Sequence, residues 1–138
     1  MSNAHEGGCV CGAIRFVCEG EPLLVAHCHC RDCQKSSGAA FATVVVVPRA
    51  GFRLLKGKPA GYVYRGDSGQ NLTRQFCAQC GAPLFTEVES MPDAWIVRAV
   101  AFDEPSRFVP QMHIYTASAQ PWGVISEGLP SYPGMPSP

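Results

Sequence analysis

The sequence predicts a small, mainly β domain of short antiparallel strands, stapled by zinc ions. Apolar residues recur at every second position in several short segments, which is the period of a half-buried strand. The 138 residues include 14 glycines and 12 prolines, a composition that favours many turns over long helices. Seven of the eight cysteines fall into three tight groups, whose side chains could bind metal ions that connect distant strands.

The expected strands follow one another along most of the chain. Ile14, Phe16 and Cys18 alternate with Arg15 and Val17, which predicts the first strand. Most of the other candidates end at Gly, Pro, Asp or Ser, as strands commonly do. They are residues 23–26, 39–47, 51–55, 62–65, 72–76, 83–88, 95–102 and 112–115.

One helical turn is expected at residues 31–37, where Gly38 suits the left-handed conformation that ends many helices. A chain of this length fits a single domain. We expect one zinc domain over residues 5–130, followed by a proline-rich tail over residues 131–138.

Charge and hydropathy exclude several function classes. Eleven basic and eleven acidic side chains cancel, and no Lys/Arg run could neutralise a row of phosphates, so we expect no nucleic-acid partner. No apolar stretch approaches the roughly 20 residues of a membrane-spanning helix, and no signal peptide opens the sequence. We therefore expect a cytoplasmic protein that binds no membrane. In such a reducing compartment, clustered cysteines bind metal more often than they form disulfides. Exposed strand edges are compatible with a homodimer.

The first and last cysteine groups suit a closed metal site. They are Cys9-x-Cys11 and Cys77-x2-Cys80, and a glycine follows each pair where the chain must turn sharply around an ion. Four thiolates on Zn²⁺ leave no vacant coordination position, so such a site stabilises a fold and does not react.

The middle group is Cys28-x-Cys30-x2-Cys33. Three sulfurs within six residues can bind one side of an ion and leave a fourth position for water, a substrate thiol or a nearby side chain. The spacing also allows a second closed site, a different pairing of the seven cysteines, or an iron–sulfur cluster.

A second closed site would need a fourth ligand from the chain. The candidates are His27, His29 and Cys18. His29 fits poorly, because in an extended turn its side chain points away from the cysteines on either side of it. Cys18 continues the apolar face of its strand and is interpreted as a core cysteine.

Four segments resemble the glutathione-dependent formaldehyde-activating enzyme family, which shares its domain with the centromere protein V group. They are GCVCGAIRF at 8–16, CHCRDCQKSSG at 28–38, RQFCAQCG at 74–81 and PQMHIY at 110–115. The resemblance spans roughly residues 7 to 130. It implies an Mss4-like (β-tent) fold, two zinc ions and carbon–sulfur lyase activity on glutathione and formaldehyde.

The resemblance also implies a role for each cysteine group. The first and last pairs would hold a structural zinc, which places four ligands at Cys9, Cys11, Cys77 and Cys80. The middle trio would hold the second zinc and form the catalytic site at Cys28, Cys30 and Cys33.

The chemistry of the trio favours thiol activation. Three thiolates on Zn²⁺ leave a formal charge of −1, so the ion would polarise a carbonyl only weakly. It is better suited to binding an incoming thiol and presenting it as the nucleophilic thiolate. Glutathione carries carboxylates, and the nearest polar groups in the sequence are Arg31, Lys35 and Ser36, which also fit a solvated helical face.

Two functions from different classes follow. The first is a zinc-dependent carbon–sulfur lyase-like enzyme that forms or cleaves an S-hydroxymethyl-type adduct between a thiol, such as glutathione, and a small aldehyde. The second is a non-catalytic zinc-binding structural or interaction module of the same fold. Arg74 could equally have a structural or a functional role. His113 is interpreted as a core histidine and not as a catalytic base.

Overall fold

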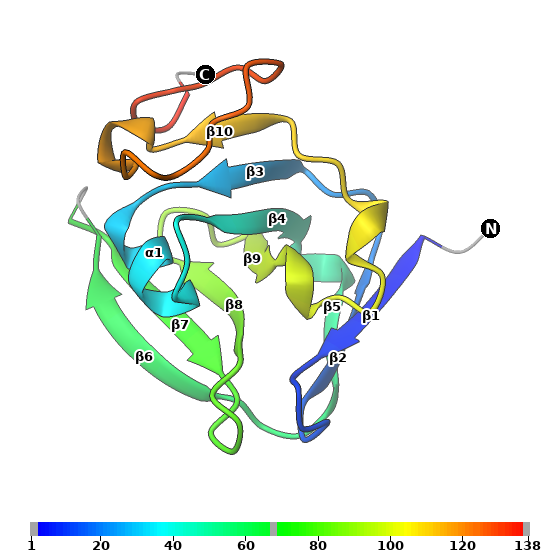
Figure 1. Cartoon of the computed structure of the whole chain (residues 1–138). Coiled ribbons are helices and arrows are strands. Elements are labelled where there is room, and N and C mark those ends of the chain that lie inside the picture. Colours follow the sequence, from blue (N-terminus) through cyan, green and yellow to red (C-terminus); the bar gives the residue numbers. More distant parts are fainter. Residues whose placement is uncertain (1–2, 67–68, 137–138) are drawn as a thin grey trace.

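A computed structural model of the chain describes residues 3–66 and 69–136 (Figure 1). Within these ranges, ten strands form two sheets, and one α-helix and four short 3₁₀ helices accompany them. The strands are β1 (Ala4–Gly8), β2 (Arg15–Glu19), β3 (Leu24–Cys28), β4 (Ala42–Pro48), β5 (Phe52–Lys56), β6 (Ala60–Arg65), β7 (Asn71–Phe76), β8 (Pro83–Val88), β9 (Ala94–Arg98) and β10 (Met112–Ile114). The helices are α1 (Arg31–Ser37), η1 (Arg49–Gly51), η2 (Ala99–Ala101), η3 (Pro105–Arg107) and η4 (Thr116–Ser118).

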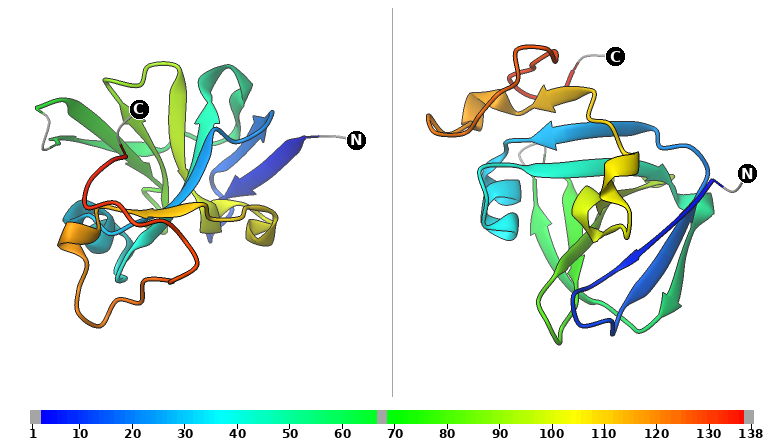
Figure 2. Two further views of the ribbon diagram at one scale, coloured as in Figure 1. Left: turned by 90° about the horizontal axis from the view of Figure 1, so that it is seen from above. Right: turned by 45° about the vertical axis from the view of Figure 1, so that its right-hand side comes forward.

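The smaller sheet has three strands in the order β1-β2-β5, all antiparallel. The larger sheet has the order β10-β3-β4-β9-β8-β7-β6, and its one parallel pair joins β10 to β3. Figures 1 and 2 show the small sheet beside the strongly curved large sheet, with β10 at the far edge. Residues 130–134 lie against β10, where the Tyr132 amide donates to the carbonyl of His113 at 2.9 Å.

The main hydrophobic core fills the space between the two sheets. Phe16 of β2 is completely buried and packs against Phe52, Phe85 and Phe102, with ring centroids 5.4–5.8 Å apart. The facing residues of the large sheet alternate along their strands, as a pleated sheet requires. They are Val25, Val45, Val47, Trp95 and Val97.

The other face of the large sheet carries α1 and a second apolar cluster. This cluster contains Ala26, Cys28, Ala42 and Val44, the residues that alternate with the core-facing set. Because the valines of β4 face both clusters, this strand is a nearly continuous apolar run, typical of a strand covered on both sides.

Local sequence signals fix the ends of α1. The side chain of Cys30 caps the helix by accepting a hydrogen bond from the Cys33 amide at 3.3 Å. At the other end Gly38 has φ of 67°, a left-handed conformation that glycine adopts at little cost. The helix therefore occupies residues 31–37, as the sequence predicts.

The mainly β fold expected from the sequence is confirmed, with differences in detail, among them the parallel pairing of β10 with β3. Strand β1 has no counterpart among the expected strands. The expected strand at 95–102 ends at Arg98, where the chain turns into η2. Within the described residues, no helix combines the length and the apolar character needed to cross a membrane.

Truncation of the central phenylalanine should destabilise the protein. Phe16→Ala removes a fully buried ring from the contact between the sheets, and we expect a loss of about 3–5 kcal/mol in the free energy of unfolding. Val63→Ala, at a side chain that is 61% exposed, is the control and should change stability by less than about 0.5 kcal/mol. Urea denaturation of the metal-loaded protein measures both, and equal effects would contradict this description of the core.

Candidate metal centres

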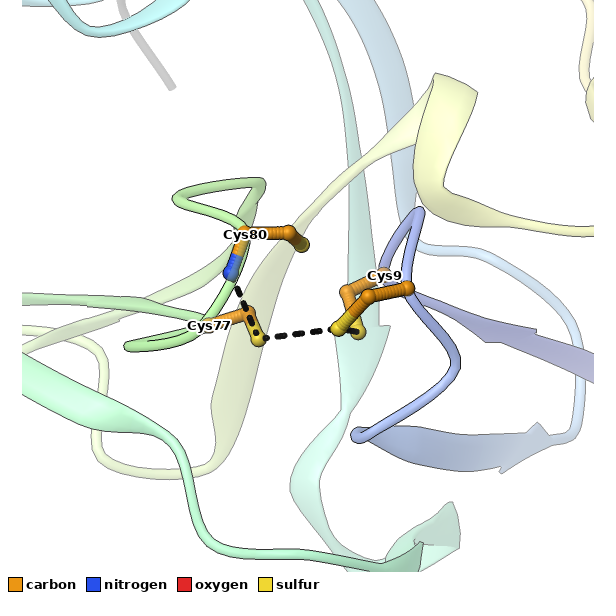
Figure 3. Close-up of side chains that lie close together, drawn as sticks. Cys9, Cys77 and Cys80 are labelled. Carbon is orange, nitrogen blue, oxygen red and sulfur yellow. Dashed lines mark hydrogen bonds between the residues drawn. The ribbon is translucent and has the colours of Figure 1, made fainter.

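The first and last cysteine pairs meet at the junction of the two sheets. Cys9 and Cys11 lie in the turn between β1 and β2, and Cys77 and Cys80 lie in the turn between β7 and β8. Figure 3 shows these two turns facing each other. All four sulfurs lie within 4.8 Å of one another, so the structure assembles a four-cysteine group from residues far apart in the chain.

The spacing of these sulfurs fits a tetrahedral zinc ion. The Sγ atoms of Cys9 and Cys11 are 3.6 Å apart, and those of Cys11 and Cys77 are 3.7 Å apart. Zn–S bonds of about 2.3 Å at tetrahedral angles place neighbouring sulfurs about 3.8 Å apart. The donor set and its geometry therefore suit a closed, four-coordinate site.

Backbone amides stabilise negative charge on the sulfurs of this four-cysteine group. The amide of Ile14 donates to Cys9 Sγ at 3.2 Å, and the amide of Cys80 donates to Cys77 Sγ at 3.4 Å. Backbone N–H groups of Cys11 and Ala82 lower the pKa of the Cys80 thiol to about 6. Such hydrogen bonds favour thiolates, the form in which cysteine binds metals.

Both turns depend on a glycine after the second cysteine. Gly12 and Gly81 have φ values of 81° and 78°, in the left-handed region that other residues rarely adopt. The Gly81 amide donates to the Cys77 carbonyl at 2.7 Å and closes its turn. This is the local reason for the Cys-Gly sequence in both pairs.

The middle group assembles where β3 meets α1. Cys28 is the last residue of β3, Cys30 caps α1, and Cys33 lies in its first turn. Their sulfurs also lie within 4.8 Å of one another. Cys28 and Cys33 are buried and Cys30 is partly exposed, so the group is open to solvent on one side only.

Negative charge in this trio gathers on Cys30. Hydrogen bonds from the thiols of Cys28 and Cys33 lower the pKa of Cys30 to about 2, and the Cys33 amide and the charge of Arg74 act in the same direction. The same sharing of protons raises the pKa of Cys28 well above its usual range. Three thiolates this close together would repel one another, and a bound divalent cation would offset their charge. The trio therefore also suits a metal ion.

None of the three candidates for a fourth ligand joins the trio. His27 Nδ1 hydrogen-bonds Thr43 Oγ1 at 2.8 Å, and Cys18 is buried in the core between the sheets. His29 points away from the trio, and its Nε2 lies 2.9 Å from His113 Nδ1. In the part of the chain that the structure describes, no fourth Cys, His, Asp or Glu joins the trio.

The contacts of His113 fix which nitrogens carry protons. The Ser126 amide donates to His113 Nε2 at 3.1 Å, so in the neutral ring the proton lies on Nδ1. His113 Nδ1 then donates to His29 Nε2, which leaves the proton of His29 on its own Nδ1. Neither nitrogen of His29 has a lone pair free for a metal. Burial lowers the pKa of His113, in agreement with neutral rings.

The residues expected to bind glutathione are only partly near the trio. Arg31 and Lys35 are exposed on α1, and Arg31 donates to the side chain of Gln34. Ser36 points inward, where its hydroxyl donates to the Asp32 carbonyl and accepts from Arg98 Nη2, both at 2.6 Å. The cation beside Ser36 is thus Arg98, which the sequence analysis did not single out.

The family model described as "Glutathione-dependent formaldehyde-activating enzyme" matches residues 4–118. Among solved structures, a crystal structure of a Rhodobacter sphaeroides protein matches with a TM-score of 0.55 and 22% sequence identity. That match covers 71% of this chain and 87% of the other, and at this identity it supports the fold alone.

The two cysteine groups should differ in what their loss does. Cys77→Ser should remove one of two bound zinc ions and lower the thermal midpoint by about 10 °C, because an ion between the two sheets contributes at least ~3 kcal/mol. Cys30→Ser should also remove one ion but shift the midpoint less, because the trio lies within one segment at the end of β3. Elemental analysis and thermal denaturation measure these effects. Full zinc content in either variant would contradict the assignment of its group.

Proposed function

Because the chain belongs to the glutathione-dependent formaldehyde-activating enzyme family, we propose that it is a zinc enzyme acting on an adduct of a thiol and a small aldehyde. In this proposal Cys9, Cys11, Cys77 and Cys80 hold a structural zinc. The trio of Cys28, Cys30 and Cys33 holds the second zinc and forms the catalytic site. The family has the Mss4-like fold, in agreement with the two-sheet architecture of the chain.

The observation that carries the proposal is the incomplete ligand set of the trio. A purely structural zinc is usually held by four protein ligands, whereas catalytic sites keep one position open. Three sulfurs converge here, and His27, His29 and Cys18 lie outside the group. The partly exposed Cys30 marks the side from which an external ligand can approach.

The reaction follows from the chemistry of a thiol at that open position. Zinc bound there would lower the pKa of a coordinated thiol and favour its thiolate form. In the adduct-forming direction, the thiol sulfur bonds to the aldehyde carbon, and the carbonyl oxygen gains the proton that the thiol has lost. The reverse direction breaks the carbon–sulfur bond, which is a lyase reaction. Glutathione and formaldehyde are the pair suggested by the family description.

The surroundings of the trio hold its three sulfurs in place. The Cys33 amide fixes the position of Cys30 Sγ, and Gln34 Nε2 donates to the carbonyls of His29 and Ser118 at 2.6 and 3.0 Å. Gln34 is buried and thereby ties α1 to the segment after β10. These contacts would keep the sulfurs preorganised for a metal. A reducing compartment such as the cytoplasm would keep them unoxidised.

The proposed activity is tested against the uncatalysed reaction, since glutathione and formaldehyde combine without an enzyme. Two-dimensional exchange NMR on an equilibrated mixture measures the rate of interconversion directly. We expect the zinc-loaded protein to accelerate exchange and Cys30→Ser to abolish that acceleration, because only two trio sulfurs remain. Cys18→Ala, which removes a thiol from the core and leaves both cysteine groups intact, should retain it. Exchange at the background rate with the native protein would favour a non-catalytic zinc module.

A further inference from the structure

Two arginines lie on the same face of the large sheet as the cysteine trio. In β-sheets, residues directly opposite one another on neighbouring strands point to the same face. Arg98 of β9 pairs with Val44 of β4, two positions from Ala42, the partner of Cys28. Cys28, Ala42 and Val44 belong to the second apolar cluster, so Arg98 lies on the same face of the sheet as that cluster.

Arg74 reaches the same face through the neighbouring strands. It pairs with Thr86 of β8, and Thr86 pairs with Ile96 of β9, which packs against the second apolar cluster. Arg74 Nη2 donates to the hydroxyl of Tyr64 at 2.7 Å, and its guanidinium carbon lies 5.3 Å from the centre of that ring.

Arg98 is a buried cation without a carboxylate partner. Its side chain is only 5% exposed, and its one side-chain hydrogen bond among the described residues goes from Nη2 to Ser36 Oγ. The ion pairs of the described chain join carboxylates to four other arginines. These are Arg15, Arg49, Arg53 and Arg107. Because an isolated buried charge is costly, Arg98 needs a counter-charge of another kind.

The cysteine trio supplies that counter-charge. Burial lowers the pKa of the Arg98 guanidinium, whereas negative charge on Cys33 raises it, and the neighbouring Arg74 lowers it. Arg74 lies on the same face of the sheet as these sulfurs, across β8 from β9. Two guanidinium groups and one set of sulfurs therefore share this face of the sheet, and negative charge on the sulfurs offsets the positive charge of both arginines.

The balance of charge depends on the fourth ligand. A divalent ion with three thiolates has a formal charge of −1. Together with the two positive charges of Arg74 and Arg98, the net charge is then +1. A thiolate in the fourth position brings the centre to −2 and balances both arginines. Asp32 directly precedes Cys33 in α1, but its side chain is exposed, so water screens the charge of its carboxylate.

We propose that Arg74 and Arg98 make the open position of the trio selective for an anionic fourth ligand, a thiolate, over neutral ligands such as an amine, imidazole or water. They act through their charge, as positioning residues, while the thiol gives its proton to solvent. The inference rests on the proposed function, since it assumes a metal in the trio with one open position. It assigns ligand selection to β7 and β9, in place of the exposed cations of α1.

The test uses cobalt-loaded protein. Its own cysteine thiolates already give a sulfur-to-cobalt charge-transfer band, and an added thiolate that binds Co²⁺ increases this absorption, so the increase can be titrated. The two ligands are 2-mercaptoethanol, which binds as a thiolate, and imidazole, which binds as a neutral molecule. Arg98→Gln and Arg74→Gln should each weaken thiolate binding on the order of tenfold, as expected for the loss of one nearby unit charge at an effective dielectric constant of about 20. Imidazole binding should change less than about twofold, because a neutral ligand gains little from the two charges.

Two controls separate charge from structure. Arg98→Lys keeps the positive charge and should keep most of the preference for the thiolate. Arg53→Gln removes an exposed arginine of the small sheet, paired with Glu19, and should change neither affinity. If Arg98→Gln and Arg74→Gln weakened the binding of 2-mercaptoethanol and of imidazole equally, the role of the arginines would be merely structural and the inference would be overturned. Unchanged affinities for both ligands would also overturn it. A native protein whose charge-transfer absorption does not change when 2-mercaptoethanol is added would overturn the proposed function together with this inference.

Discussion

The convergence of sulfurs from two distant turns is the contact on which the rest of the structure depends. Cys9 and Cys11 end the hairpin of the small sheet, and Cys77 and Cys80 end the hairpin of the large one. A zinc ion between them would lock the sheets together at one end, while the aromatic cluster around Phe16 packs them along their length. A short chain rich in glycine and proline gains stability from such a cross-link, because its strands are brief.

The trio differs from the four-cysteine group in its electrostatics. In the four-cysteine group Cys11 and Cys80 are exposed, and backbone amides offset negative charge on Cys9 and Cys77. The trio is more buried, and its charge is offset by Arg98 and Arg74. A metal bound by this trio beside two cations would, under the proposed function, favour one further negative ligand. The trio has only three sulfurs and has two arginines near it, and both observations favour a reactive role for the trio.

Sequence reasoning was most accurate where structure is locally determined. Helix α1 has its predicted ends because Cys30 and Gly38 cap it, and the spacing of the cysteines predicted both groups. Strand β1 has the weak strand sequence Ala-His-Glu-Gly-Gly and becomes a strand through pairing with β2. The place of Arg98 beside the trio depends on registers across β3, β4 and β9, which no local pattern reveals. The single arginine within the apolar segment 94–99 was the one available signal.

Zinc-edge anomalous diffraction from crystals of the zinc-loaded protein, grown with and without glutathione, tests the central claim most directly. The account predicts two zinc ions, each with sulfurs at about 2.3 Å. One should be bound by Cys9, Cys11, Cys77 and Cys80. The other should be bound by Cys28, Cys30 and Cys33, with a fourth ligand that becomes the glutathione sulfur when glutathione is present. A protein side chain as the fourth ligand of the second ion, or a single ion in the molecule, would contradict the account.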